Sequence, residues 1–210
     1  MKVTITQDTK WIRALNAARR TIGLPMKPED YKPSDKWKKM VLMAEHSPIK
    51  LVEYCISFEE LRQWVGVHLL RHDYTIPMIH SQRGDRRNLN DEYPYLEKVM
   101  QIIKEDLNNP NLVPRDCVIQ GQTNDQDFYV NCQTLINISR KRLCNCASKE
   151  TKEAWVAVKD AIAEVDPIMA MFMVPNCVYR GFCPEMECCG FYKTKLFDKQ
   201  VKEYRALIGR

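Results

Sequence analysis

The amino-acid sequence predicts an α/β fold in which helices alternate with short strands. Its 210 residues suffice for one compact domain with a hydrophobic core. Apolar residues at three- and four-residue spacing, typical of helices, are separated by shorter stretches rich in β-branched residues. We expect strands at residues 2–6 and 51–57, an extended segment at 74–81, and helices at 9–21, 35–45, 58–71, 95–107, from 126–131 to 144, 149–163 and 167–173.

Composition and charge exclude several classes of protein. The net charge of +5 is spread over segments in which acids and bases alternate, so a free nucleotide is a better expected ligand than a nucleic-acid polymer. No apolar run approaches eighteen residues, and residues 1–23 are too charged for a secretory leader, so we expect a cytoplasmic protein without membrane contact. Glycine-rich phosphate loops of the Rossmann and P-loop kinds are absent.

Nine cysteines, an odd number, predict reduced thiols instead of a disulfide framework. Cys177, Cys183, Cys188 and Cys189 crowd the last sixth of the chain. Four thiolates can hold zinc, but the usual pair of Cys-x-x-Cys hooks is absent, so we expect buried thiols and no metal, with zinc as the alternative.

The densest group of functional side chains lies in residues 68–83, which hold three of the four histidines and two arginines. His68 and Arg71 fall at the end of a predicted helix, and the extended segment follows. Arginine forks and a hydroxyl suit an anion, so Arg71, Ser81 and Arg83 are the expected phosphate-facing set. The alternative is that these arginines pair with nearby aspartates on a solvated surface.

This group resembles the signature of the flavin-dependent thymidylate synthases. That family reads Arg-His-Arg, seven residues, Ser, one residue, Arg. This chain has Arg71-His72 and then, nine residues after His72, Ser81-x-Arg83.

Two further regions support the resemblance, which spans roughly residues 45 to 155. Arg115, Asn131, Asn137 and Arg142 recur at spacings similar to the family's distal half. Residues 45–48, Glu-His-Ser-Pro, resemble the family's Gly-His-x-Ser/Thr-Pro entry into its central sheet.

The chain departs from the family pattern at several positions. Asp73 replaces the second arginine of the triplet, and Met78-Ile79 replaces an Asn-Glu pair before the serine. The remaining departures are His68 for a glutamine, Cys146 for a histidine and Lys50 for a glutamate.

The resemblance implies a thymidylate synthase-complementing-like fold: a single domain with a central mixed sheet flanked by helices, over residues 1–175. Residues 176–210 would form a Cys-rich C-terminal extension packed on it. It also implies a homotetramer with shared sites, in which Arg115 and Arg142 serve a site whose Arg71 and Ser81 come from another chain.

The implied activity is that of a methyltransferase: FAD-dependent reductive methylation of dUMP to dTMP with methylenetetrahydrofolate and NADPH. Because reduced flavin takes part in this chemistry, we expect no catalytic cysteine, although Cys144 and Cys146 flank the predicted pocket helix. The expected substrate-binding residues are His68, Arg71, Ser81, Gln82, Arg83, Arg115 and Arg142, with Arg142 and Ser81 catalytic. The expected flavin-binding residues are Ser47, Arg71, His72, Asn131 and Asn137.

Two alternatives follow from the departures at Asp73, Met78 and Ile79. One keeps the site and changes the product, for instance to a hydroxymethylated pyrimidine nucleotide. The other is a non-catalytic nucleotide-binding homologue, with a zinc-stabilised tail.

Overall fold

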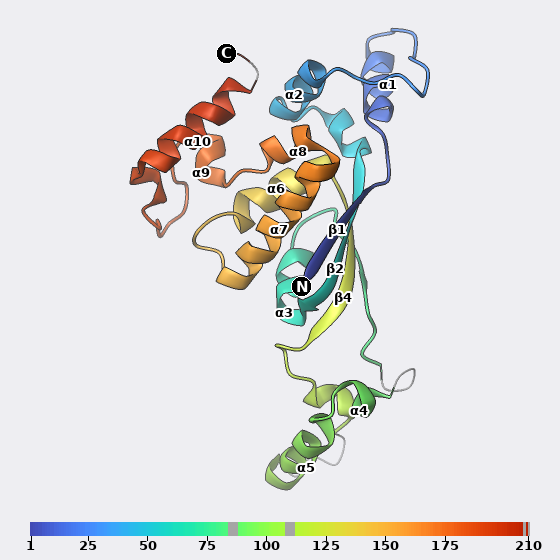
Figure 1. The fold of residues 1–210 in the computed structure, drawn as a ribbon, viewed down its shortest axis with the longest axis vertical. Helices are drawn as coiled ribbons and strands as arrows, with labels where there is room; N and C mark the ends of the chain where they lie inside the picture. Colours follow the sequence, from blue (N-terminus) through green and yellow to red (C-terminus); the bar gives the residue numbers. More distant parts are fainter. Residues whose placement is uncertain (84–87, 108–111, 208, 210) are drawn as a thin grey trace.

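A four-stranded antiparallel sheet lies at the centre of the fold (Figure 1). The computed structural model describes residues 1–83, 88–107, 112–207 and 209. Over these residues the strands lie in the order β1-β2-β4-β3, and each neighbouring pair is antiparallel. Their bounds are β1 (Lys2–Gln7), β2 (Glu53–Arg62), β3 (Ile76–Ile79) and β4 (Thr123–Asn131).

Helices make up most of the rest of the described chain, which confirms the α/β class. They are α1 (Trp11–Thr21), α2 (Asp35–Met43), α3 (Gln63–Leu70), α4 (Leu89–Glu92), α5 (Leu96–Leu107), α6 (Cys132–Arg142), α7 (Lys149–Val165), α8 (Pro167–Phe172), α9 (Asn176–Arg180) and α10 (Lys195–Ala206). Three short 3-10 helices are η1 (Ser47–Leu51), η2 (Pro114–Cys117) and η3 (Phe191–Lys193).

The predicted mixed sheet is wrong. The helix expected to start between residues 126 and 131 starts just after that range, at Cys132 with Asn131 as its N-cap, and a strand that was not predicted occupies residues 123–131. That segment is β4, which pairs antiparallel with both β2 and β3. Its side chains alternate between buried and less buried positions, as in a strand, but Asn124 and Gln126 occupy two buried positions. Polar residues on the buried face therefore hide the apolar alternation that identifies a strand.

The helix predicted at residues 58–71 begins later, at Gln63. Phe58 and Leu61 belong to β2, where a bulge between them lets both side chains stay buried. Gly66 brings α3 close to β4, because a Cβ there would lie 2.0 Å from Oε1 of Gln126.

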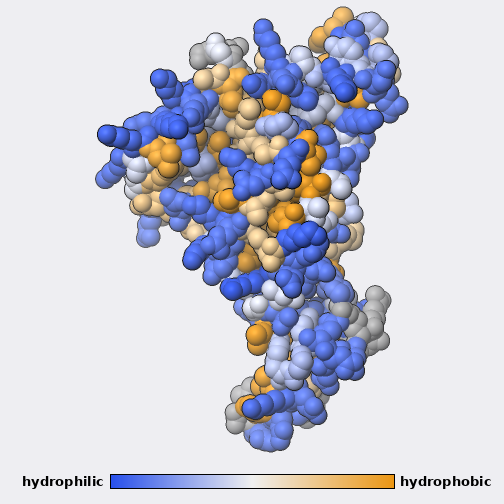
Figure 2. All heavy atoms as spheres, viewed as in Figure 1, coloured by the Kyte–Doolittle hydropathy of each residue, from blue (hydrophilic) through white to orange (hydrophobic). Residues whose placement is uncertain are grey.

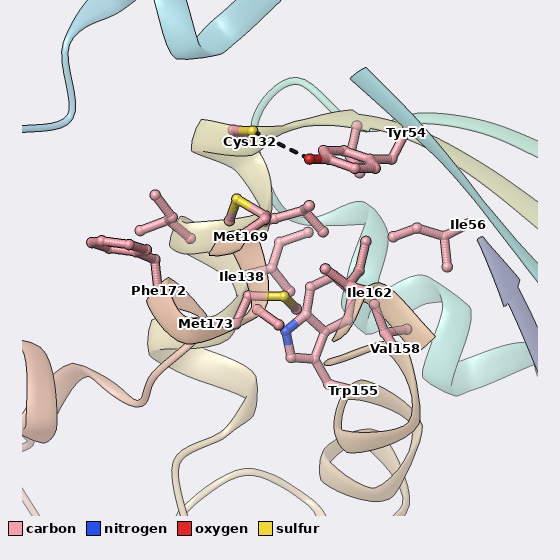
Figure 3. Close-up of a cluster of buried hydrophobic side chains, with 14 of the residues drawn as sticks. Tyr54, Ile56, Cys132, Ile138, Trp155, Val158, Ile162, Met169, Phe172 and Met173 are labelled. Atoms are coloured by element: carbon pink, nitrogen blue, oxygen red, sulfur yellow. Dashed lines mark hydrogen bonds between the residues drawn. The ribbon is translucent and has the colours of Figure 1, made fainter. Parts of the chain in front are cut away.

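Helices α6, α7 and α8 cover one face of the sheet and form the main core with it (Figure 1). Figure 3 shows Trp155, Val158 and Ile162 of α7 directed towards Ile56 of β2 and Ile138 of α6. The longest described helix thus supplies much of the buried apolar surface that stabilises the fold.

A polar group lies within this core. The carboxylate of Asp166 accepts hydrogen bonds from Nε1 of Trp11 and, at 2.8 Å, from the hydroxyl of Tyr54. It also accepts from the backbone amide of Met169 at 3.1 Å, which caps α8 at the helix start predicted beside Pro167. Burial raises the pKa of Tyr54 well above its ordinary value, so this hydroxyl remains a donor.

A second, smaller core joins α4, α5 and η2 at one end of the molecule, apart from α6 (Figure 1). At the other end, Cys177, Val178, Phe197 and Tyr204 of α9 and α10 belong to the main core. The C-terminal residues therefore pack on the rest of the chain, while a domain division at residue 175 stays a prediction. Within the described ranges, the helices are too short or too polar to span a membrane.

Candidate functional site

The C-terminal ends of α3 and α6 meet, and this brings together three of the predicted site residues. Arg142, the last residue of α6, donates from Nε to Nε2 of His72 at 3.0 Å. It also donates from Nη2 to the backbone carbonyl of His68 at 2.6 Å. His72 returns towards α6 because α3 ends at Leu70 and the chain turns before β3, with Tyr74 in the left-handed region at φ 62°. We call Arg142, His68, His72 and the neighbouring Arg71 the arginine-histidine site.

This site is positively charged and partly shielded from water. Burial, followed by the charge of Arg71, lowers the pKa of Arg142 from its ordinary value. Burial and then Arg142 lower the pKa of His72 to about 4, so His72 is neutral at pH 7. Since its Nε2 accepts from Arg142, its ring proton lies on Nδ1. These two hydrogen bonds leave Nη1 of Arg142 and Nδ1–H of His72 as candidate donors to a ligand.

His68 is held by residues that the sequence motifs did not identify. Its Nδ1 lies 3.2 Å from Oγ1 of the fully buried Thr151, which also accepts from the hydroxyl of Ser148 at 2.7 Å. The ring of Trp64 packs edge-on against the imidazole. Burial lowers the pKa of His68, as do the charges of Arg142 and Arg71. In the sequence, Thr151 is marked only by its position on the buried, mainly apolar face of the helix that became α7.

The predicted flavin residues outside the arginine-histidine site lie along α6 and η1. Asn131 caps α6, since its Oδ1 accepts from the backbone amide of Thr134 at 3.0 Å. Asn137 is exposed, and its Oδ1 accepts from Nε2 of Gln133 at 3.2 Å. Ser47 is exposed at the start of η1, which packs against α6. The helix thus presents Asn137 and Arg142 in different surroundings, because a separation of five residues on an α-helix turns the side-chain direction by about 140°.

A second arginine of α6 is the centre of an ion-pair network that sequence analysis missed. Arg140 is paired with Glu45, whose carboxylate also accepts from Nε2 of Gln133 at 2.7 Å. The guanidinium carbon of Arg140 lies 3.7 Å from the ring centroid of Tyr179. Burial alone would raise the pKa of Glu45, but the hydrogen bonds from Arg140 and Gln133 hold it below its ordinary value.

The other predicted substrate residues lie beyond β3 and in the smaller core. Oγ of Ser81 accepts from the backbone amide of Arg83 at 3.3 Å. Gln82 is buried, and its Nε2 has no hydrogen-bond partner among the described residues. Arg115 is exposed on η2 and lies apart from α6, because the chain after β3 runs towards α4 and α5 (Figure 1). Within one chain, the structure does not bring Arg115 to the arginine-histidine site.

Three of the departures from the family pattern, at Asp73, Met78 and Ile79, are on the surface. Met78 and Ile79, which replace an amide and a carboxylate, are 58% and 42% exposed on β3. Asp73 is exposed, and its backbone carbonyl accepts from Oγ1 of Thr134 at 3.5 Å. None of these side chains is needed for the core.

A cavity of about 720 Å³ lies elsewhere, between the end of α6, α7 and the C-terminal segment. Its wall includes Leu143 and Cys144 after α6, Val156 of α7, and Leu196 and Tyr204 of α10. In the space-filling view, apolar surface is visible beside the C-terminal helices, between projecting charged side chains (Figure 2). We call this cavity of about 720 Å³ the C-terminal cavity. Its described lining includes none of the predicted substrate or flavin residues.

Comparison with known proteins defines the fold. No protein-family model matches the chain, and no curated protein is detectably similar in sequence. Among solved structures, however, the chain has the fold of the flavin-dependent thymidylate synthases, which confirms the predicted resemblance.

The particular enzyme in these matches is ThyX of Helicobacter pylori, solved with FAD and dUMP. One structure is 16% identical, with a TM-score of 0.62, and the match covers 83% of this chain and 100% of that chain. In the other, the identity is 17%, the TM-score is 0.58, and the match covers 77% of this chain and 93% of that one.

Proposed function

We propose that the chain is a flavin-dependent thymidylate synthase that binds FAD and dUMP. It would methylate the uracil ring reductively to give dTMP, with methylenetetrahydrofolate and NADPH as co-substrates. The observation that carries this proposal is the arginine-histidine site on a thymidylate synthase fold: a half-buried Arg142 beside Arg71, with hydrogen bonds to a neutral histidine and a carbonyl.

The electrostatics of this site favour an anionic ligand. Burial and then the charge of Arg71 lower the pKa of Arg142, as expected of a partly buried cation near a second cation. A phosphate or an electron-rich uracil carbonyl would offset the repulsion between these two cations and accept from Nη1. The donors therefore fit a nucleotide and the charged part of a flavin dinucleotide.

We assign roles to the remaining residues from the resemblance. Arg142 would stabilise negative charge that develops on the pyrimidine, with Ser81 as its partner in catalysis. Flavin, when bound, supplies the redox chemistry. The nucleotide would contact His68, Arg71, Ser81, Gln82, Arg83, Arg115 and Arg142, and the flavin would contact Ser47, Arg71, His72, Asn131 and Asn137.

A shared site accounts for the position of Arg115. Because Arg115 lies on η2, apart from α6, it would reach the nucleotide only from a second copy of the chain. Arg142, in contrast, meets Arg71 within the same chain. We therefore propose a homotetramer in which the arginine-histidine site is completed by a neighbour's η2.

The test is the visible absorption spectrum of protein that has been supplemented with FAD and desalted, recorded before and after dUMP is added. We expect a retained flavin band that shifts with dUMP, because both ligands share one pocket. Mass analysis of the product should then show dTMP, and a hydroxymethylated product would contradict the proposed reaction. Loss of flavin on desalting would contradict flavin catalysis and favour a non-catalytic nucleotide-binding homologue.

A further inference from the structure

The C-terminal cavity has the size and the lining of a small-molecule site. Its volume of about 720 Å³ lies within the range of about 300–1,000 Å³ that is typical of ligand pockets. Its wall combines residues that follow α6 with residues of α7, α8, α9 and α10. The described lining includes none of the residues predicted to bind a nucleotide or a flavin, so an occupant would be a further ligand of the chain.

Apolar side chains in the wall of this cavity are open to solvent. Val156 of α7, Met171 of α8 and Leu196 of α10 line the cavity and are 39%, 41% and 54% exposed. Single exposed apolar residues are ordinary on protein surfaces, but these three come from three helices and line one concave surface. The apolar part of a ligand would remove this surface from water.

A more open depression adjoins the cavity along α7. Its volume is about 400 Å³, and three of its lining residues, Lys152, Val156 and Asp160, also line the cavity. The depression is lined by α7 from Lys149 to Asp160, which corresponds to about 16 Å along the helix axis. Together the two hollows form an elongated site, which suits an extended hydrocarbon chain better than a compact ring.

Two lysines of α7 line the cavity without a carboxylate partner. Nζ of Lys152 donates to the side-chain oxygen of Asn145, and no carboxylate in the described part of the chain forms an ion pair with Lys152 or Lys159. Lys159 is half-buried, and burial lowers its pKa from the ordinary value, although the charge of Asp160 acts in the opposite direction. An anionic group on a ligand would therefore stabilise the ammonium group of Lys159.

The carboxylates in the wall do not cancel these positive charges. Glu185 is paired with Lys141 at 3.0 Å, and Glu203 is paired with Lys199 at 3.8 Å. Neither of these two lysines belongs to the described lining of the cavity. Asp160 is exposed, so that solvent screens its charge. The electrostatics of the wall therefore favour a negatively charged group on the ligand.

We propose that the C-terminal cavity binds a fatty acid, with the hydrocarbon chain against the apolar wall and the carboxylate at Lys159. The size of the cavity, its exposed apolar side chains and its unpaired lysines carry this proposal. Lys152 lies two turns away on the same side of α7 but already has Asn145 as a partner, so Lys159 is the residue that we assign to the carboxylate. Binding is non-covalent and independent of the proposed enzymatic function.

The first experiment is isothermal titration of the full chain, freed of copurifying lipid, with laurate below the concentration at which it forms micelles. We expect saturable binding of about one laurate per chain. Laurate should also raise the melting temperature, because it binds the folded chain. Lauryl alcohol, which has the same hydrocarbon chain without a carboxylate, should bind about 10-fold more weakly.

Two outcomes of these titrations would overturn the proposal, whether or not the chain binds FAD or dUMP. Equal affinities for laurate and lauryl alcohol would show that the site does not recognise a carboxylate. Binding of laurate that does not saturate would show adsorption to apolar surface instead of a site.

The matched variants are Lys159→Met and Lys199→Met, which each replace an ammonium group by an apolar side chain. Lys199 is 70% exposed on α10 and lies outside the described lining. We expect Lys159→Met to bind laurate about 10-fold more weakly than the wild type and lauryl alcohol equally well. Lys199→Met should bind both like the wild type. Equal laurate affinities in the two variants would overturn the role of Lys159.

Val156→Trp tests where the hydrocarbon chain lies. The larger side chain would occupy space beside α7, so laurate and lauryl alcohol should both bind at least about 10-fold more weakly. Because Val156 is 39% exposed, we expect the variant to fold, and its melting temperature checks this. Unchanged laurate binding by folded Val156→Trp would overturn the placement of the ligand. Should this variant fail to fold, the comparison of laurate with lauryl alcohol in the wild type and in Lys159→Met still decides.

Discussion

Arg140 and Arg142 lie two residues apart on α6 and have opposite electrostatic surroundings. Arg140 is paired with the carboxylate of Glu45 and stacks on Tyr179. Arg142 donates to a neutral His72 and to a backbone carbonyl. The charged group that acts on its pKa is Arg71, a second cation. The same residue type on one helix is thus neutralised at one position and left as a net positive charge at the other.

The difference supports the proposal that Arg142 binds a ligand, whereas Arg140 has a structural role. Opposite charges that are partly buried and hydrogen-bonded to each other stabilise the native state. Removing one of them destabilises the fold, because the other charge stays partly buried without a partner. The guanidinium groups of Arg71 and Arg142 do not stabilise each other, because both are positively charged. A bound anion would be attracted to both of them. Substitutions at the two positions should therefore affect different measurements.

Arg142→Ala should have the largest effect, on nucleotide binding. Loss of a charge-assisted hydrogen bond costs about 1.5–3 kcal/mol, which corresponds to a decrease in dUMP affinity of roughly 10- to 100-fold. The free energy of unfolding should fall by about 1 kcal/mol or less. Isothermal titration with dUMP and thermal denaturation measure the two effects.

The control for this variant is Arg13→Ala on α1, where the side chain is 59% exposed and 3.9 Å from Glu53. Its dUMP affinity should equal that of the wild type. Equal affinities in both variants would contradict the placement of Arg142 in the nucleotide site.

Arg140→Ala should mainly lower stability, by about 2 kcal/mol, because it leaves Glu45 partly buried without its cation. For a chain of this size the melting temperature should fall by about 4–8 °C. The pKa of Glu45 is depressed in the folded state, so the stabilisation is present at neutral pH and is lost as the pH falls below 4.5. Urea denaturation at pH 7 and in acid compares the variants.

Glu45→Gln tests the same pair from the other side and should remove most of this acid dependence. If Arg140→Ala weakened dUMP binding more than it weakened the fold, the proposed division between the two arginines would be wrong.

Sequence analysis singles out Arg142 as a candidate site residue, but it could not predict the environment that distinguishes Arg142 from Arg140. Local patterns predicted α1, α5, α7 and α8, because helical periodicity and capping depend on neighbouring residues. The partner of Arg140 lies 95 residues away and is brought close only by packing of the whole fold. β4 was missed because Asn124 and Gln126 bury polar groups, which a hydrophobic pattern cannot identify as a strand.

Arg142→Gln should raise the pKa of His72 from about 4 towards 6.5 without reaching it. Burial, the larger cause of the depressed pKa, remains in the variant, while the neighbouring charge is removed. The unfolded chain binds a proton below pH 6.5 that folded His72 excludes, so wild-type stability falls as the pH drops towards 4. This fall should be smaller in the variant.

A pH titration of the His72 ring by NMR, in the wild type and in the variant, measures this pKa directly. An unchanged His72 pKa would show that Arg142 does not set the charge state of this site.

The smallest expected effects come from the two asparagines of α6, which extend the comparison between structural and ligand-facing residues. Asn131→Ala removes the helix cap and should lower the free energy of unfolding by about 1 kcal/mol. Asn137→Ala removes an exposed amide and should change it by less than about 0.5 kcal/mol. The Asn137→Ala substitution should instead lower flavin retention after desalting by a few-fold, because the exposed amide of Asn137 is accessible to a ligand. Unchanged flavin retention together with a loss of stability equal to that of Asn131→Ala would place Asn137 among the structural residues of α6, beside Arg140.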